Sequence, residues 1–231
     1  VVDDVMYVTT PENEVLALDA ATGQVFWSYV HPLEDVLTLC CGKQSRGVAM
    51  LGNTLYLATM DARLVALDAA TGNVVWNTKV ANPLDGYSLT AAPLVVHDLV
   101  ITGIAGGEFG IRGFVDAYDA KTGARRWRTY MIPGEGEPEN DTWDGDSWKT
   151  GGASTWQTGA YDPALNLVYW GVGNPGPDWN GETRMGDNLY SDSVVAMDGD
   201  TGEIRWHFQF TPHDVHDWDA CQTPVLVDAM W

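Results

Sequence analysis

One eleven-residue pattern occurs four times in this chain and constrains its fold more than any other feature. The pattern reads Ala-x-Asp-x-x-Thr-Gly-x-x-x-Trp, and its copies span 17–27, 66–76, 117–127 and 196–206. Asp-x-x-Thr-Gly is typical of a turn in which the Asp side chain caps the backbone and the Gly adopts a positive φ. An apolar strand before the turn and a Trp in the strand after it predict a β-hairpin that presents a large aromatic for packing between repeats.

The spacing of the repeats predicts a β-propeller. Trp27, Trp76, Trp127 and Trp206 are separated by 49, 51 and 79 residues. A period near 50 residues with several strands in each copy is typical of a propeller blade. The longer last interval predicts an insertion of about 30 residues that includes 133–149. The fold class is therefore all-β, and we expect an arc of about four blades of a larger ring rather than a closed four-bladed propeller.

Strand patterns fill the intervals between the repeats, at 54–58, 94–96, 99–102, 167–170 and 193–197. The first residues, 5–8, and the last, 223–231, also read as strands, and the chain begins with Val. We therefore expect an internal segment of a longer protein. No run of about 18 apolar residues occurs, so no membrane-spanning segment is expected.

The charge of the chain restricts its partners. Asp and Glu number 32 against 12 Lys and Arg, which gives a formal net charge of −20. Such a surface repels nucleic-acid backbones and anionic lipids, so neither is an expected partner. It suits cationic partners, or metal ions where carboxylates converge.

An adjacent cysteine pair, Cys40-Cys41, is the first candidate functional feature. Taken alone it allows two interpretations, either two buried free thiols or a disulfide that closes a strained eight-membered ring. A disulfide would require an oxidising compartment.

Three Gly-rich loops carry further candidates, namely Glu108 in 106–113, Trp156 in 151–163 and Asn174 in 171–180. Glycines beside a carboxylate let backbone amides approach an anion closely. Each residue also has a plainer interpretation: a solvated Glu, a Trp of the blade core and a turn-forming Asn.

The segment 211–220 is rich in Asp and His, so zinc has to be considered. Zinc prefers tetrahedral sites with nitrogen and sulfur ligands, whereas Glu, Asn and Asp together make a hard oxygen site suited to calcium-like ions. We therefore expect His213 and His216 to be structural.

Repeats and loops together resemble the pyrroloquinoline quinone (PQQ)-dependent alcohol dehydrogenases of the methanol and ethanol class. That family has tryptophan-docking motifs in an eight-bladed propeller. The Trp repeat also occurs in propeller scaffolds that catalyse nothing, so the order of the loops carries the resemblance. It extends over residues 1–231, which are therefore interpreted as one partial quinoprotein β-propeller domain.

The resemblance implies that PQQ lies between a vicinal Cys40–Cys41 disulfide and the indole of Trp156. It assigns Arg46 to the quinone carbonyls, and backbone amides before Glu108 to a PQQ carboxylate. Many relatives have Ser where this chain has Ala105, so a side-chain contact there stays open. The implied cofactor-binding residues are Cys40, Cys41, Arg46, Thr90, Ala105, Gly106, Gly107, Ser154 and Trp156. The disulfide implies a periplasmic location.

The resemblance also implies one metal ion, held by Glu108, Asn174, Asp217 and Asp219. Calcium-dependent members commonly have a small or neutral residue two positions after the catalytic base, and members resembling the lanthanide-dependent branch have a second Asp. Glu108, Asp217 and Asp219 together supply a charge of −3, where the calcium pattern supplies −2. We expect one lanthanide(III) ion, with Ca²⁺ as the alternative; a solvated loop Asp is the plainer interpretation of Asp219.

The activity implied is oxidation of a small primary alcohol to the aldehyde. Asp217 is the implied catalytic base, hydride passes to metal-polarised PQQ, and a cytochrome c accepts the electrons. The acidic surface suits a basic cytochrome, and the resemblance also allows a homodimer. The alternatives are a non-catalytic propeller scaffold and a membrane-bound type of PQQ sugar dehydrogenase. The vicinal cysteines and the Gly-Glu-Phe-Gly segment at 107–110 fit the alcohol branch better.

Overall fold

The computed structural model describes residues 1–33 and 37–229, and over this range the chain is all-β, as predicted. Its strands are β1 (Val5–Thr9), β2 (Glu14–Asp19), β3 (Val25–Val30), β4 (Val48–Leu51), β5 (Thr54–Thr59), β6 (Arg63–Asp68), β7 (Val74–Lys79), β8 (Leu94–Val96), β9 (Leu99–Gly103), β10 (Phe114–Asp119), β11 (Arg125–Tyr130), β12 (Ala160–Asp162), β13 (Leu167–Val172), β14 (Ser193–Asp198) and β15 (Ile204–Gln209). Short 3₁₀ helices lie in the connections: η1 (Pro83–Asp85), η2 (Gly107–Phe109), η3 (Asn140–Thr142), η4 (Ser147–Thr150) and η5 (Gly181–Thr183).

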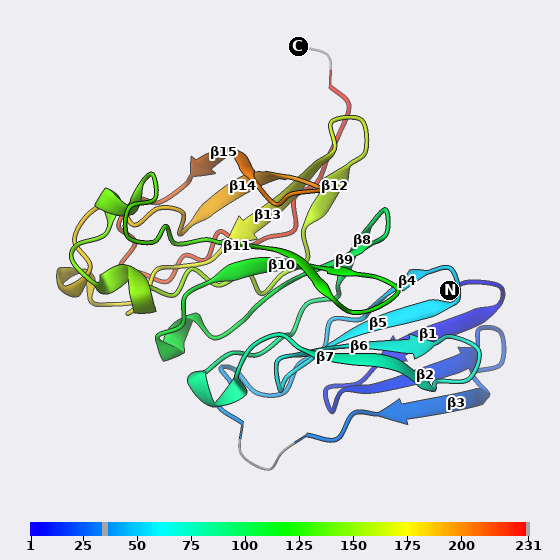
Figure 1. Ribbon diagram of the computed structural model, residues 1–231. Coiled ribbons are helices and arrows are strands. Elements are labelled where there is room, and N and C mark those ends of the chain that lie inside the picture. The colour runs from blue at the N-terminus through cyan, green and yellow to red at the C-terminus, as the bar shows by residue number, and fades with distance from the viewer. Residues whose placement is uncertain (34–36, 230–231) are drawn as a thin grey trace.

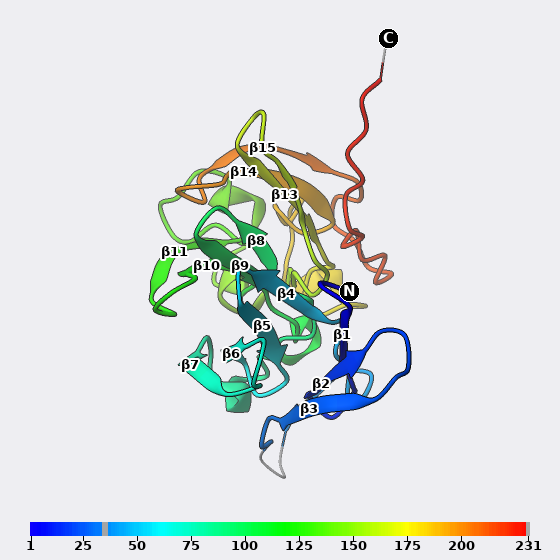
Figure 2. The same cartoon turned by 90° about the vertical axis from the view of Figure 1, so that its right-hand side faces the viewer.

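These strands form four antiparallel sheets, which are the predicted blades. Blade 1 is β1-β2-β3, blade 2 is β4-β5-β6-β7, blade 3 is β8-β9-β10-β11 and blade 4 is β12-β13-β14-β15. Strands that are consecutive in sequence are neighbours within each sheet, which is the meander of a propeller blade. The blades follow one another through the molecule from blue to orange (Figure 1), and the view turned by 90° shows the same succession (Figure 2).

Each copy of the repeat forms the hairpin that its sequence predicts. In the first copy, Asp19 Oδ1 accepts hydrogen bonds from the backbone N–H groups of Ala21 and Thr22, at 3.0 and 2.7 Å. The repeated Ala lies opposite the repeated Trp across the hairpin, as in the pair Ala17 and Trp27. The register shifts directly after this Ala in all four copies, so the strand that carries the Trp has one extra residue, a β-bulge.

The repeated Trp and Gly are contact partners between adjacent blades. Trp27 of blade 1 lies over Gly72 of blade 2, where an added Cβ would be 2.6 Å from the indole Cε3. The indole also donates to the carbonyl oxygen of Ala69 at 3.1 Å. Trp76 donates in the same way to Ala120 O of blade 3 at 3.0 Å. At Gly72, Gly123 and Gly202 the motif Gly is thus required both by its positive φ and by this close packing, whereas at Gly23 only the positive φ applies.

The hydrophobic cores lie between neighbouring blades. The cluster between blades 1 and 2 includes Val15, Leu55, Leu57, Val65 and Leu67. The cluster between blades 2 and 3 includes Tyr56, Leu64, Ile104, Phe114 and Tyr118. The cluster between blades 3 and 4 includes Ile101, Val115, Trp127, Trp170 and Val195. Both faces of the middle sheets are therefore buried, and the fold is a stack of sheets joined by apolar packing.

Two long loops account for the wide last interval of the repeat. The loop 131–159 joins blades 3 and 4 and contains the predicted insertion 133–149, and the loop 173–192 joins β13 to β14. None of the helices in 1–33 and 37–229 is long and apolar enough to cross a membrane.

The prediction of a strand at 223–231 was wrong for the residues that the structure describes. Residues 223–229 form no strand, and 230–231 lie outside the described range. Val225 and Val227 are 83% and 77% exposed. The alternating pattern is present in the sequence, but a strand also needs a partner for its backbone hydrogen bonds, and the described residues supply none here.

Candidate active site

A pocket of about 320 Å³ collects residues from segments far apart in the sequence. Ten of the thirteen predicted site residues line it: Cys40, Cys41, Arg46, Thr90, Ala105, Gly106, Glu108, Trp156, Asp217 and Asp219. The other lining residues are Leu39, Gly42, Gln44, Ser88 and Asp178. These residues lie in connections between strands or, for Asp217 and Asp219, in the segment after β15, where a rigid scaffold presents variable residues.

The remaining three predicted residues lie directly behind the lining. Ser154 and Asn174 are each 2% exposed. An added Cβ on Gly107 would be 3.3 Å from Ser154 Oγ, so the two segments are packed together. Asn174 donates its backbone N–H to Asp219 Oδ1 at 3.2 Å. These residues therefore support the wall from behind.

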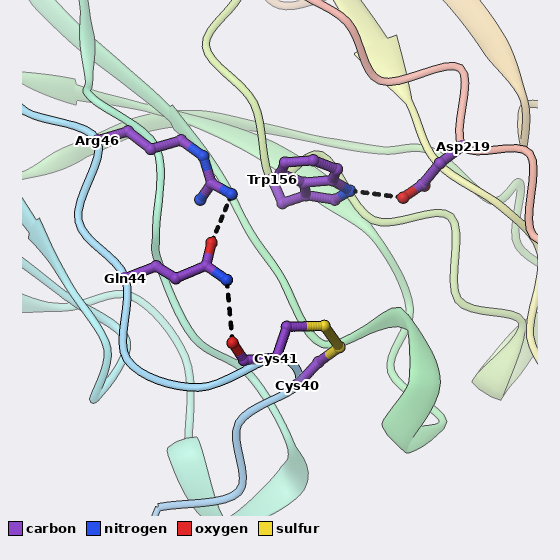
Figure 3. Close-up of a disulfide and its surroundings, with 6 residues drawn as sticks. All are labelled: Cys40, Cys41, Gln44, Arg46, Trp156 and Asp219. Carbon is purple, nitrogen blue, oxygen red and sulfur yellow. Dashed lines mark hydrogen bonds between the residues drawn. A yellow bond between two sulfur atoms is a disulfide. The ribbon is translucent and has the colours of Figure 1, made fainter. Parts of the chain in front are cut away.

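Cys40 and Cys41 are joined by a disulfide, so free thiols are excluded at this pair. Gln44 links the disulfide to the arginine: its Nε2 donates to Cys41 O at 3.3 Å, and its Oε1 accepts from Arg46 at 2.6 Å (Figure 3). The Arg46 guanidinium lies 4.7 Å from the ring centroid of Trp156, a cation–π contact. The disulfide, the guanidinium and the indole thus face one pocket.

Thr90 joins the arginine segment to the tryptophan segment. Its carbonyl oxygen accepts from the backbone N–H of Arg46 at 3.1 Å and from the guanidinium at 3.3 Å. Its hydroxyl donates to the carbonyl oxygen of Trp156 at 3.4 Å. Thr90 therefore connects two walls of the pocket.

The three backbone N–H groups before Glu108, at residues 105–107, differ in their hydrogen bonding. Ala105 donates its N–H to Ser88 O at 2.8 Å. Within the described residues no acceptor is found for the N–H groups of Gly106 and Gly107. Gly106 has φ +116°, and an added Cβ would be 2.0 Å from a backbone carbonyl oxygen of Gly86, so only glycine fits. An anion contact through this loop therefore falls to Gly106 and Gly107.

The carboxylates of the pocket repel one another. Burial raises the pKa of Glu108, and Asp178 and Asp217 raise it further. Asp217 is exposed, but partial desolvation raises its pKa to about 6, with additional repulsion from Asp219 and Asp178. Asp219 shows the same direction, again mainly through burial, although its two oxygens accept from Trp156 Nε1 at 3.1 Å and from the Asn174 N–H.

This donor set fits a metal ion by its chemistry. Carboxylate and amide oxygens are hard ligands, and a cation placed among carboxylates removes the repulsion that raises their pKa values. Across 1–33 and 37–229, however, no three His, Cys, Asp or Glu side chains converge closely enough to form a ready metal cluster. The residues are therefore gathered at one pocket without being a preassembled cage.

Sequence reasoning missed Asp178, Gln44 and Ser88 as pocket residues. A signal existed for Asp178, which follows Asn174 by four residues in the same Gly/Pro loop. The two histidines of 211–220 do not line the pocket: His213 Nδ1 lies 2.8 Å from a backbone carbonyl oxygen, and His216 stacks on Trp218. Both positions agree with structural roles.

Comparison with known proteins now identifies the family. The profile described as "Glucose/ethanol/alcohol dehydrogenase, beta-propeller domain", a PQQ family, matches residues 1–231. The chain belongs to this family. The predicted resemblance to PQQ-dependent alcohol dehydrogenases is thereby confirmed.

Two relatives illustrate the membership. The quinoprotein alcohol dehydrogenase PedH of Pseudomonas putida is 46% identical, over 94% of this chain and 39% of its own length. The lanthanide-dependent methanol dehydrogenase of Methylorubrum extorquens is 41% identical, over 99% of this chain and 41% of its own. The chain thus spans about two fifths of the length of these curated relatives.

A solved europium-containing methanol dehydrogenase has the same fold. It superposes with a TM-score of 0.89 at 40% identity, covering 96% of this chain and 42% of that structure. The four blades described here therefore correspond to part of a larger propeller in that protein.

Proposed function

We propose that the full-length protein oxidises a primary alcohol of the methanol and ethanol class to the aldehyde, using PQQ and one metal ion. The observation that carries the proposal is the convergence of the Cys40–Cys41 disulfide, Arg46, Trp156 and the acidic side chains on one pocket of the family's propeller. The names of the relatives, which include alcohol and methanol dehydrogenases, support the same reaction class.

The walls of the pocket suit a flat, anionic cofactor. The indole of Trp156 and the disulfide offer apolar surfaces against which a planar ring can pack. Arg46 supplies a cation beside the indole, and the N–H groups of Gly106 and Gly107 are available for a carboxylate. When bound with its metal, PQQ supplies the hydride acceptor of the reaction.

Asp217 is the proposed base that takes the hydroxyl proton of the alcohol. Its carboxyl group lines the pocket, and its pKa of about 6 in the absence of metal leaves it deprotonated at neutral pH, as a base has to be. Glu108, Asn174, Asp217 and Asp219 would hold the ion. Three carboxylates favour a lanthanide(III) over Ca²⁺ at this position, because their negative charge attracts a trivalent ion more strongly than a divalent one.

The cellular setting is also part of the proposal. A disulfide at Cys40–Cys41 supports a periplasmic location, where such bonds persist. The net charge of −20 supports a basic cytochrome c as electron acceptor. A homodimer is compatible with this proposal.

The experiment is an assay of the full-length protein loaded with PQQ and either La³⁺ or Ca²⁺, with ethanol-dependent reduction of an artificial dye as readout. Turnover with La³⁺ and little with Ca²⁺ is expected. Turnover with Ca²⁺ alone would keep the alcohol oxidation and remove Asp219 from the ligand set. Glucose serves as the control substrate, because turnover with glucose but not ethanol would favour a sugar dehydrogenase. Failure to bind PQQ would favour the scaffold.

A further inference from the structure

Asp178 is an acidic residue of the pocket that the predicted ligand set does not include. It is half-buried and lines the pocket together with Glu108, Asp217 and Asp219. Its Oδ1 accepts a hydrogen bond from Asn174 Nδ2 at 2.7 Å. The contact joins a carboxylate of the pocket to the one proposed metal ligand that is not a carboxylate.

This hydrogen bond determines which end of the Asn174 amide faces Asp178. An ionised carboxylate only accepts, so the amide group that faces it has to be the NH₂. The amide oxygen, which is the atom a metal binds, is thereby turned away from Asp178. The backbone of Asn174 is held on both sides, through its N–H to Asp219 and through its carbonyl oxygen, which accepts from Ala153 N at 2.9 Å. The amide orientation is then the remaining freedom, and Asp178 restricts it together with the carbonyl oxygen of Pro175, which accepts from the same Nδ2 at a longer 3.4 Å.

The backbone that carries Asp178 is anchored by a buried arginine. Arg184 is 0% exposed and donates to the carbonyl oxygen of Pro177 at 3.2 and 3.1 Å and to that of Asp178 at 3.5 Å. The same guanidinium donates to the carbonyl oxygen of Asp214, in the segment that carries Asp217. Burying a guanidinium is costly unless its donors are satisfied. The hydrogen bonds of Arg184 therefore fix the backbone on which Asp178 is carried.

We propose that Asp178 is a positioning residue of the metal site, which orients the Asn174 amide so that its oxygen faces the ion. This inference rests on the proposed function. Asp178 acts through Asn174 rather than as a ligand, in the way that outer-sphere groups orient metal ligands in other proteins. Its carboxylate also adds a further negative charge beside the ligands, which strengthens the preference for a trivalent ion.

The test is a titration of the full-length, PQQ-loaded protein with Tb³⁺, followed by the luminescence that a nearby Trp sensitises. Trp156, which hydrogen-bonds Asp219, is the expected donor. Asp178→Ala should weaken Tb³⁺ binding by about 10–100-fold, the range for loss of an outer-sphere partner. Asp178→Asn keeps an acceptor oxygen at the same place and should lose less. Glu182→Ala is the matched control, because it removes an exposed carboxylate from the same loop outside the pocket.

Each outcome separates the inference from the proposed function. Unchanged Tb³⁺ binding in Asp178→Ala, with normal binding by the wild-type protein, would overturn the inference and leave the dehydrogenase intact. Equal losses in Asp178→Asn and Asp178→Ala would overturn positioning and leave only an effect of charge. Absence of Tb³⁺ binding by the wild-type protein would overturn the metal site of the proposed function as well. Far-UV circular dichroism of each variant checks that it has folded.

Discussion

Carboxylates occupy two kinds of site in this molecule, and the pKa values of Asp119 in one and Asp217 in the other move in opposite directions. In the turns of the repeats, here called the docking turns (19–23, 68–72, 119–123 and 198–202), Asp119 has a lowered pKa because Thr122 donates to it from its side chain and its backbone. In the pocket, burial and like charges raise the pKa of Asp217 and of Asp219. The same chemical group is therefore stabilised as an anion in one region and destabilised as an anion in the other.

This difference in carboxylate pKa values indicates that the docking turns serve stability and the pocket serves function. A docking turn satisfies its carboxylate within five residues and offers a Gly to the Trp of the adjacent blade, so it contributes to stability. The pocket gathers carboxylates from separate loops and leaves their repulsion uncompensated among the described side chains. Perturbed groups of this kind gather at functional sites, where a substrate, cofactor or ion completes the balance. Changes in the pocket should affect activity before stability, and changes in the docking turns the reverse.

The largest expected effect is on catalysis at the pocket. Asp217→Ala should lower kcat by about 10²–10⁴-fold, because it removes the proposed base. PQQ should still bind, since its proposed contacts lie on other residues, and the melting temperature should change little. Steady-state dye reduction and the absorbance of bound PQQ measure the two quantities. Normal turnover in this variant would remove Asp217 from the mechanism.

A second pocket variant tests ion selectivity. Loss of an outer-sphere partner of a metal typically costs about 10–100-fold, and Asp219 is a proposed direct ligand. Asp219→Ala should therefore weaken lanthanide-supported activity by at least this factor, and calcium-supported activity far less. The physical reason is that one carboxylate fewer costs a trivalent ion more than a divalent one. Activities are compared over La³⁺ and Ca²⁺ titrations. Equal losses with both ions would count against Asp219 as the ligand that selects the lanthanide.

A docking-turn variant should show the opposite behaviour. At Gly123, which has φ +71°, an added Cβ would be 2.7 Å from Trp76 Cε3. Gly123→Ala should cost about 1–3 kcal/mol of backbone strain plus the cost of displacing the indole. Gly52→Ala is the matched control, since Gly52 also has a positive φ but nothing within 4 Å of an added Cβ. Denaturant unfolding measures both. A cost for Gly123→Ala no greater than for Gly52→Ala would refute the role of Gly123 in blade packing.

The smallest expected effect is a pH-dependent one. Asp192 is 0% exposed, and burial together with Asp214 raises its pKa to about 7. Because this exceeds the unfolded value of 3.8, ionisation of Asp192 destabilises the folded state progressively between about pH 4 and pH 7. Asp192→Asn should therefore raise the melting temperature of the metal-free protein at pH 8 by a few degrees, and not at pH 4.

Asp119→Asn provides the comparison from a docking turn. The folded-state pKa of Asp119 is lowered, so its ionised carboxylate stabilises the folded state. This stabilisation is present above the unfolded pKa of 3.8 and disappears as the pH falls through the folded-state pKa. This variant should therefore lower the melting temperature at pH 8 and have no such effect once the pH is below the lowered folded-state pKa. A rise at pH 8 in both variants, or in neither, would remove the contrast between the two regions.

Much of the candidate site was accessible from the sequence because its loops follow in an order that a known family shares. The resemblance placed Arg46, Trp156 and Asp219 in one site, and the structure brings all three to one pocket. Asp178 was missed because that resemblance assigns it no role, although its loop was recognised. The strand predicted at 223–231 was wrong over the described residues because alternation of apolar residues indicates a capacity to pair but does not supply a partner.

The sequence by itself determined the docking turns, the hairpins and the number of blades. These depend on hydrogen bonds that close within a few residues and on a Trp and a Gly that recur at a regular spacing, so a local pattern is sufficient. Only the tertiary structure decided which carboxylates meet, that Asp178 accepts a hydrogen bond from Asn174, and which amides before Glu108 have an acceptor within the described part of the chain. Those properties depend on distances through space between loops of different blades, and neither electrostatic repulsion nor a hydrogen bond between loops follows from separation along the chain.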